Sequence, residues 1–151
     1  MSVSRRLLTR IASSEAQDAE LIALGQELDS LFAQVAGPEA LLAEREAIWR
    51  AAGHSYALIH KNRARFWRSR HKFGVDAAAI ERNKLLDQID ALHARIRPIE
   101  PKTFAGLAVK AQATRGYARR LWEESEADLD YDQLLIRRFV DEVYELGQRS
   151  H

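Results

Sequence analysis

Residues 77–97 read AAAIERNKLLDQIDALHARIR, and this stretch decides the fold. No proline or glycine interrupts it, and most of its residues are good helix formers. Its apolar positions recur at spacings of four, three and four residues, at Leu85, Ile89, Leu92 and Ile96. Antiparallel helices pack along a seam of this kind. The stretch therefore predicts a helix with one apolar edge that needs a partner helix.

The rest of the chain repeats this pattern. Apolar residues recur at helical spacing in four further stretches, and no run of alternating β-branched residues predicts a strand. We therefore expect an all-α protein, an antiparallel bundle of about five helices. The expected helices cover residues 15–36, 38–72, 77–97, 104–125 and about 131–147.

Capping residues and helix breakers set the expected ends. Ser14 and Gln17 read as a capping box at the start of the first helix. Gly37 and Pro38 should end it, because glycine accepts a left-handed cap and proline cannot continue a helix. Further N-caps are expected at Asp76, Thr103 and either Asp128 or Asp130, and Gly147 should close the last helix.

The second expected helix is unusually long. Its 35 residues contain no proline after the first position, and its apolar residues share one meridian: Leu41, Ile48, Ala52, Ile59 and Phe66. At 1.5 Å per residue it would reach about 50 Å. We therefore expect an elongated hairpin over residues 38–97, with a mild kink at Gly53. It would belong to a single domain, residues 1–151, with a flexible start (1–13) and a C-terminal helix pair (103–147).

Composition limits the class of protein. The chain has 151 residues, of which 46% are hydrophobic and 30% charged, as in a folded rather than a disordered protein. No apolar stretch approaches the ~20 residues that a membrane-spanning helix needs. The absence of cysteine excludes disulfides and Cys-ligated metals, and it fits the cytoplasmic location that we expect.

Charge is segregated along the chain. Residues 45–72 hold eight basic and one acidic side chain, whereas residues 123–151 hold three basic and nine acidic ones. A helical wheel places five basic residues opposite the apolar meridian, and they form a candidate anion or nucleic-acid face: Arg50, Lys61, Arg65, Arg68 and Lys72.

Two other interpretations of this basic stretch stay open. The acidic runs 123–126 and 128–132 could neutralise it within the chain or between subunits, or an anionic membrane surface could bind it. Arg63 and Arg70 are expected beside Trp67 instead, where a guanidinium can stack on indole.

Aromatic residues beside the same meridian suggest a partner interface. If the hairpin extends beyond the bundle, one chain cannot cover its seam. The candidate interface residues are Trp49, Tyr56, Ile59, Phe66 and Trp67, and the expected partner is a second copy or another helical protein.

Sites for chemistry are not evident. The sequence has no phosphate-binding glycine loop, no nucleophile elbow and no helical metal-binding pair. His60 and His93 are expected as boundary histidines, and the acidic residues Asp141, Glu142 and Glu145 as a solvated face. We therefore expect no enzymatic activity, no catalytic residue, no cofactor and no metal.

Three blocks carry a resemblance. Residues 18–25 (DAELIALG), 103–111 (TFAGLAVKA) and 134–142 (LLIRRFVDE) resemble blocks of small uncharacterised helical proteins of proteobacteria, some of them carried in phage-related or other mobile regions. The resemblance implies an all-helical cytoplasmic protein and transfers no catalytic residue.

These observations favour a non-enzymatic helical module for protein–protein interaction or assembly. The alternative is a nucleic-acid-binding protein that uses the basic face between residues 50 and 72.

Overall fold

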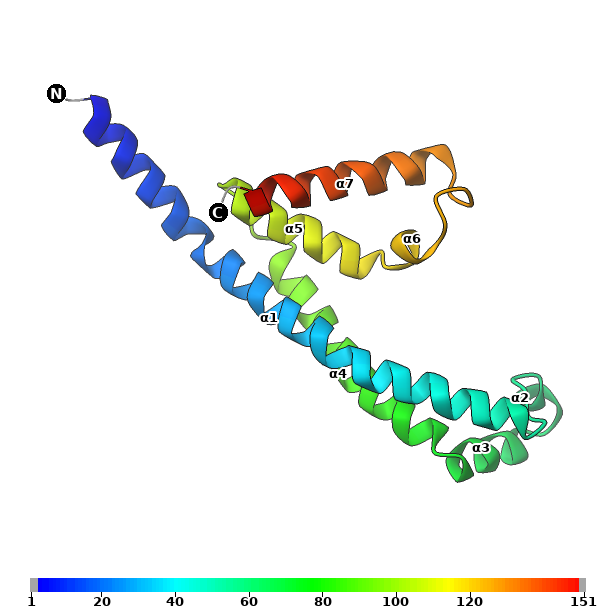
Figure 1. Ribbon diagram of the computed structural model, residues 1–151. Helices are drawn as coiled ribbons and strands as arrows, with labels where there is room; N and C mark the ends of the chain where they lie inside the picture. Colours follow the sequence, from blue (N-terminus) through cyan, green and yellow to red (C-terminus); the bar gives the residue numbers. More distant parts are fainter. Residues whose placement is uncertain (1–2, 150–151) are drawn as a thin grey trace. The chain divides into compact units, whose positions relative to one another are not determined.

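The structure is a computed structural model that describes the backbone of residues 3–149 and the side chains of residues 18–119 and 121–149. The described chain is all-α, as the sequence predicts, with no strand (Figure 1). Its helices are α1 (Val3–Ala51), α2 (Leu58–Lys61), α3 (Arg63–Lys72), α4 (Val75–Ile96), α5 (Phe104–Tyr117), α6 (Arg120–Glu123) and α7 (Tyr131–Arg149).

Contacts divide the described chain into two compact units. The central unit is Ser30–Ile89, and the terminal unit combines the chain up to Asp29 with the chain from Asp90 onward. Both boundaries fall inside the continuous helices α1 and α4. The single domain expected from chain length stays a prediction.

Helix α1 passes through Gly37 and Pro38, so the prediction that the first helix ends there is wrong. A proline inside a helix removes one backbone hydrogen bond and crowds the preceding turn, at a cost of about 3 kcal/mol. Burial on both sides of the proline offsets this cost. Four side chains share one face of the helix across it: Leu31, Val35, Leu42 and Trp49.

The beginning of α1 also differs from the expectation. The backbone is helical from Val3, so Ser14 and Gln17 lie inside the helix rather than at its start. Of the flexible segment expected over residues 1–13, residues 1 and 2 lie outside the described part and the remainder is helical.

Helix α1 ends at Ala51, so the continuous helix predicted over residues 38–72 is wrong. Gly53 has a φ of 82°, and its N–H donates to the carbonyl of Arg50 at 2.9 Å. Instead of a mild kink, this left-handed glycine marks a complete break. The predicted meridian is one residue out of register, because Leu41 and Ile48 are 41% and 42% exposed while their neighbours Leu42 and Trp49 are buried.

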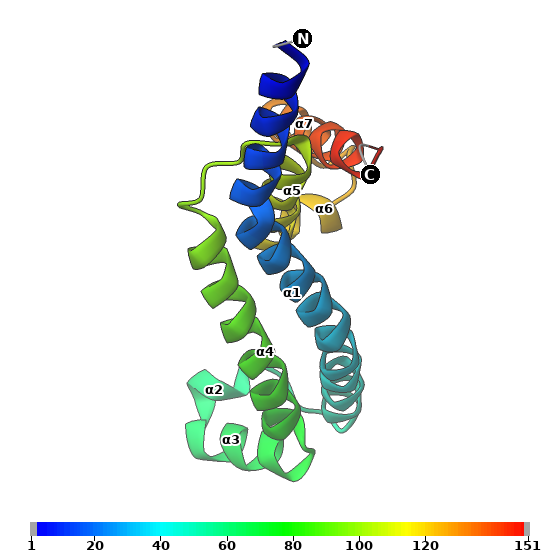
Figure 2. The same cartoon turned by 90° about the vertical axis from the view of Figure 1, so that its left-hand side faces the viewer.

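In the central unit, α2 and α3 bring the chain back so that α4 runs beside α1 (Figures 1 and 2). Trp49 is fully buried there and donates from Nε1 to the hydroxyl of Ser69 at 2.9 Å. Phe66 packs its ring edge-on against the indole at 5.9 Å between centroids. Val75 and Ala78 of α4 complete this core with Leu42.

Arg70 ties three helices together in this unit. It is buried, and its Nε donates to Oδ1 of Asp76 at 2.8 Å while Nη1 donates to the hydroxyl of Tyr56 at 3.0 Å. Glu46 lies 3.9 Å from the same guanidinium. Burial alone would lower the pKa of Arg70, but the hydrogen bonds outweigh it and raise the pKa. Asp76 therefore pairs with α3 from the first turn of α4, and it is not the N-cap that the sequence predicts.

In the terminal unit, a buried carboxylate holds the start of α5. Asp18 of α1 accepts hydrogen bonds from the backbone N–H groups of Lys102 and Thr103, at 3.0 and 2.7 Å, and from the Thr103 hydroxyl at 2.6 Å. Thr103 in turn caps α5, as predicted, by accepting from the N–H of Gly106 at 3.0 Å. A side chain at Gly106 would collide with the Asp18 carboxylate, so glycine permits this close approach.

Helices α5 and α7 form an antiparallel pair in the same unit. Gly147 of α7 lies against Ala108 of α5, and Arg115 contacts Asp141 at 3.4 Å. Gly147 is therefore buried inside α7, and the prediction that it ends the last helix is wrong. The predicted cap at Asp130 is confirmed, because its carboxylate accepts from the N–H of Gln133 at 2.9 Å.

The helix predicted over residues 104–125 is split. It ends at Tyr117, and the short helix α6 follows. In α5, Leu107 and Thr114 are exposed, and the inward positions are small: Gly106, Ala108, Val109, Ala111 and Ala113. Among the described residues, no helix combines the length and the apolar composition that a membrane crossing requires.

Candidate nucleic-acid interface

Helix α3 presents one buried and one basic face. The side chain of Asn62 accepts from the N–H of Arg65 at 2.9 Å and so caps the helix. Phe66, Ser69 and Arg70 point inward at helical spacing. The positively charged residues of the opposite face are therefore left toward solvent.

Most of the predicted basic residues are exposed on this segment. We define the basic surface as five exposed side chains of α2 and α3: Lys61, Arg63, Arg65, Arg68 and Lys72. None of them forms an ion pair with a residue whose side chain the structure describes. Arg68 only bonds the carbonyl of Ala64 at 3.4 Å, and Lys72 lies over the Phe73 ring.

Arg50 behaves differently from the other predicted members. It stands at the end of α1, exposed, and its guanidinium pairs with Glu46 at 3.2 Å. The helical wheel placed Arg50 with the others because it assumed one continuous helix over residues 38–72. In the structure α1 ends at Ala51 and α3 begins only at Arg63, so the two segments do not share a wheel.

The acidic residues nearest in sequence are already engaged. Glu46 pairs with Arg50 and Arg70, and Asp76 pairs with Arg70. In the acidic C-terminal runs, Glu123 pairs with Arg119 at 2.5 Å and Glu126 with Arg138 at 3.3 Å. These local pairs give no support to neutralisation of the basic surface within the chain.

Arg70 does not lie where the sequence analysis placed it, because it contacts Trp49, Tyr56 and Phe66 instead of Trp67. Arg63 is exposed at the start of α3, one turn before Trp67, and its stacking on that indole stays a prediction. The signal was present in the spacing, because Phe66, Ser69 and Arg70 fall on one face once α3 begins at Arg63.

The predicted partner interface is largely internal. Trp49 and Phe66 are 0% and 2% exposed and form the core, so the prediction that they contact a partner is wrong. Ile59 is half-buried against that core, and Tyr56 is held by Arg70 and Glu46. The core takes these aromatic residues because the chain folds back at Gly53.

Tyr56 and Trp67 are the members that stay accessible, each 45% exposed. The ring of Trp67 packs edge-on against Phe66 at 5.0 Å between centroids. The contact holds the indole beside the basic surface on α3. A held, half-exposed indole offers a flat surface on which another ring can stack.

The structure also places the acidic residues of α7 and the two histidines named above. Asp141 is occupied by the Trp122 indole N–H at 2.9 Å and by Arg115. No group of three or more His, Asp and Glu residues gathers among the residues searched. His60 is exposed, whereas His93 is buried between α4 and α5.

No protein-family model matches the chain, and neither a curated protein nor a solved structure is significantly similar to it. The resemblance to proteobacterial helical proteins stays a prediction.

Proposed function

We propose that the protein binds nucleic acid through the basic surface on α2 and α3. The observation that carries the proposal is the set of exposed cationic side chains that no described carboxylate neutralises. Lysine and arginine side chains in this state contact phosphates and release the counterions bound to the nucleic acid.

The dimensions and the aromatic residue favour nucleic acid over an acidic peptide. Helix α3 has ten residues and is about 15 Å long, which corresponds to about four steps along the axis of a duplex at 3.4 Å per step. Trp67 stands beside these cations, where it can stack on an unpaired base. A single-stranded segment is therefore the preferred ligand.

A charge-matched pair of variants tests the proposal by fluorescence anisotropy with labelled single-stranded and duplex oligonucleotides. The triple variant Arg65→Ala, Arg68→Ala, Lys72→Ala should lose about 10- to 100-fold in affinity. The control Lys84→Ala, Arg95→Ala, Arg149→Ala removes the same charge from exposed positions elsewhere and should stay within about twofold of wild type. Equal losses in both variants, or no binding by the wild type at low salt, would overturn the proposal.

Trp67→Ala separates stacking from charge. Loss of one stacked base costs ~1–3 kcal/mol, so affinity for the single strand should fall about 5- to 100-fold while affinity for the duplex changes little. An unchanged single-strand affinity would leave phosphate contacts as the whole of the binding.

A second candidate function, assembly with another copy of the chain, is favoured by the outer face of α7. Ile136, Phe139, Val143 and Leu146 follow a 3-4-3 spacing, and Phe139 is 67% exposed. This seam is symmetric about Asp141, so in an antiparallel pair Phe139 would face Val143 of the copy and Ile136 would face its Leu146. The expected assembly is therefore a twofold dimer through α7.

Sedimentation velocity at micromolar concentration tests this second function. Phe139→Glu should convert a dimer to a monomer. Ile80→Glu places the same charge at an exposed apolar residue of a different helix, α4, and should leave the dimer intact. A monomeric wild type would exclude the assembly.

A further inference from the structure

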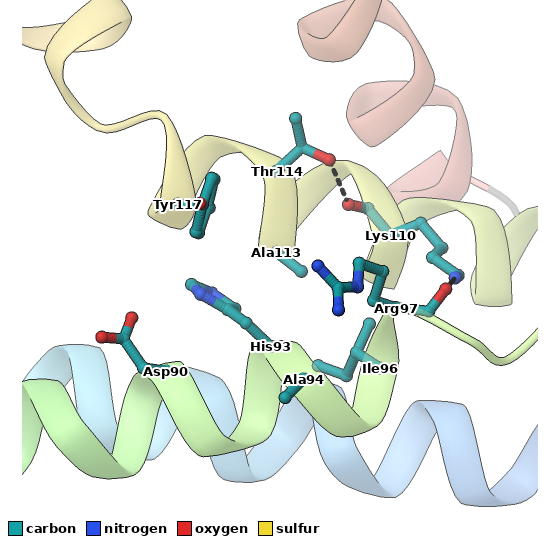
Figure 3. Close-up of a pocket in the computed structure, with 9 residues that line it drawn as sticks. All are labelled: Asp90, His93, Ala94, Ile96, Arg97, Lys110, Ala113, Thr114 and Tyr117. Carbon is teal, nitrogen blue, oxygen red and sulfur yellow. Dashed lines mark hydrogen bonds between the residues drawn. The ribbon is translucent and has the colours of Figure 1, made fainter.

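A cavity of about 360 Å³ lies in the terminal unit, between the end of α4 and α5 (Figure 3). Its volume is near the lower end of the range found for small-molecule sites. The lining is mostly apolar, with Ile96 on one side and Ala113 on the other. The cavity is independent of the basic surface, which belongs to the central unit.

Two aromatic rings form one end of the cavity. His93 and Tyr117 meet edge-on at 6.0 Å between centroids. Burial lowers the pKa of His93, and Asp90 offsets only part of this effect. The imidazole is therefore predominantly neutral at pH 7, and this end suits a flat, uncharged ring.

Two cationic side chains, Arg97 and Lys110, also line the cavity. In Figure 3 the guanidinium of Arg97 points into the space between the helices, and it makes no hydrogen bond or ion pair with a described residue. The ammonium of Lys110 donates to the main-chain carbonyl of Arg97 at 2.6 Å, on the side of Arg97 away from its guanidinium (Figure 3). Burial lowers the pKa of Lys110.

We propose that this cavity binds a small aromatic carboxylate. The ring would lie against His93 and Tyr117, between the apolar side chains of Ile96 and Ala113. The carboxylate would accept two hydrogen bonds from Arg97, the planar donor that fits it best. Asp90 lies at the opposite, aromatic end, and it disfavours a second negative charge on the ligand.

NMR titration of the ¹⁵N-labelled full chain tests the proposal with benzoate as the probe and benzamide as its neutral analogue. Benzoate should shift the amide signals of residues 93–97 and 110–117 in a saturable way, and benzamide should bind at least about tenfold more weakly because it cannot pair with Arg97. Equal binding of the two probes, or no saturable shift, would overturn the proposal.

Two variants locate the site. Arg97→Gln should weaken benzoate binding by about tenfold or more, whereas Arg95→Gln, on the same turn but directed toward Glu27, should not change it. Ala113→Leu should abolish binding by filling the cavity, and its circular dichroism spectrum checks that the variant is folded. Unchanged affinity in both Arg97→Gln and a folded Ala113→Leu would show that benzoate binds elsewhere.

Discussion

At the scale of single residues, Asp18 stabilises the terminal unit through its hydrogen bonds to the start of α5. Its buried carboxylate accepts from two backbone N–H groups and the Thr103 hydroxyl, so it holds the N-terminus of α5 through an intermediate cap. Asp18→Ala would leave these donors unsatisfied. Since hydrogen bonds to charged groups contribute ~1.5–3 kcal/mol, we expect a loss of about 2–3 kcal/mol in the free energy of unfolding.

Urea denaturation followed by circular dichroism measures this loss. Thr103→Ala, which removes the cap but leaves the backbone contacts of Asp18, should cost only about 1 kcal/mol. Glu20→Ala, at an exposed position two residues later in α1, serves as the control and should be neutral. A loss at Asp18 no larger than at Glu20 would contradict the role given to the carboxylate.

His93 makes stability depend on pH. Its pKa is lowered in the folded chain, where it lies among Asp90, Arg97, Lys110 and Tyr117. The unfolded chain therefore binds a proton more readily than the folded one, and stability rises with pH across this window. We expect the free energy of unfolding to fall as pH drops below about 6.5, the ordinary histidine value.

His93→Gln is the matching control for this titration. The variant loses the group that titrates, so its unfolding free energy should change less between pH 7 and pH 5 than that of the wild type. Parallel pH profiles for the two proteins would show that His93 does not cause the dependence.

At the scale of elements, the helical class and the α4 seam could be predicted, but the helix ends could not. Ile89, Leu92 and Ile96 are buried as their spacing predicts, because a strict seam defines one face whatever packs on it. In contrast, Gly37 and Pro38 predict the end of a helix, but α1 continues through both residues. The burial of Leu42 and Trp49 stabilises the helix beyond Pro38, and no local sequence pattern indicates this burial.

In the candidate site, too, some side-chain positions could be predicted from the sequence and others could not. The exposure of Lys61, Arg65, Arg68 and Lys72 follows from composition, since cations stay in water unless they are paired. The burial of Arg70 and of Trp49 does not, because it depends on a reversal of the chain at Gly53 that brings α3 back onto α1. A helical wheel cannot represent a contact between two helices that it treats as one.

Alanine substitutions at two glycines, one inside α1 and one just after its end, test whether the helix continues through residue 37. Gly37 lies in the helix, and apart from its chain neighbours no atom lies within 4 Å of an added Cβ. Gly37→Ala should therefore stabilise the protein by at most about 0.5–1 kcal/mol, since the ring of Pro38 crowds a Cβ on the residue before it. Gly53 has an equally open surrounding but a positive φ, so Gly53→Ala should destabilise it by about 1 kcal/mol. Thermal unfolding measures both changes, and a loss at Gly37→Ala as large as that at Gly53→Ala would contradict the difference expected between the two positions.

At the scale of the whole molecule, a net charge of +1 conceals an uneven distribution. The central unit, Ser30–Ile89, carries ten basic and six acidic residues, and the rest of the chain carries 13 basic and 16 acidic ones. Net charge and pI therefore understate the capacity to bind a polyanion. The local count of unpaired cations, rather than the overall pI of about 8.1, is the quantity that decides binding.

Salt dependence measures that local count directly. If the five side chains of the basic surface each displace one counterion, a log–log plot of binding constant against salt should have a slope of about −4 to −5 for a duplex and about −3.5 for a single strand. The triple variant Arg65→Ala, Arg68→Ala, Lys72→Ala should reduce the slope for the duplex by about 3 units, whereas the charge-matched control should keep it. The reason is that only side chains in contact with phosphates release ions, while distant charges act through a field that salt already screens. If the slope falls by the same amount in both variants, the binding depends on the charge of the whole surface and not on the side chains of α2 and α3.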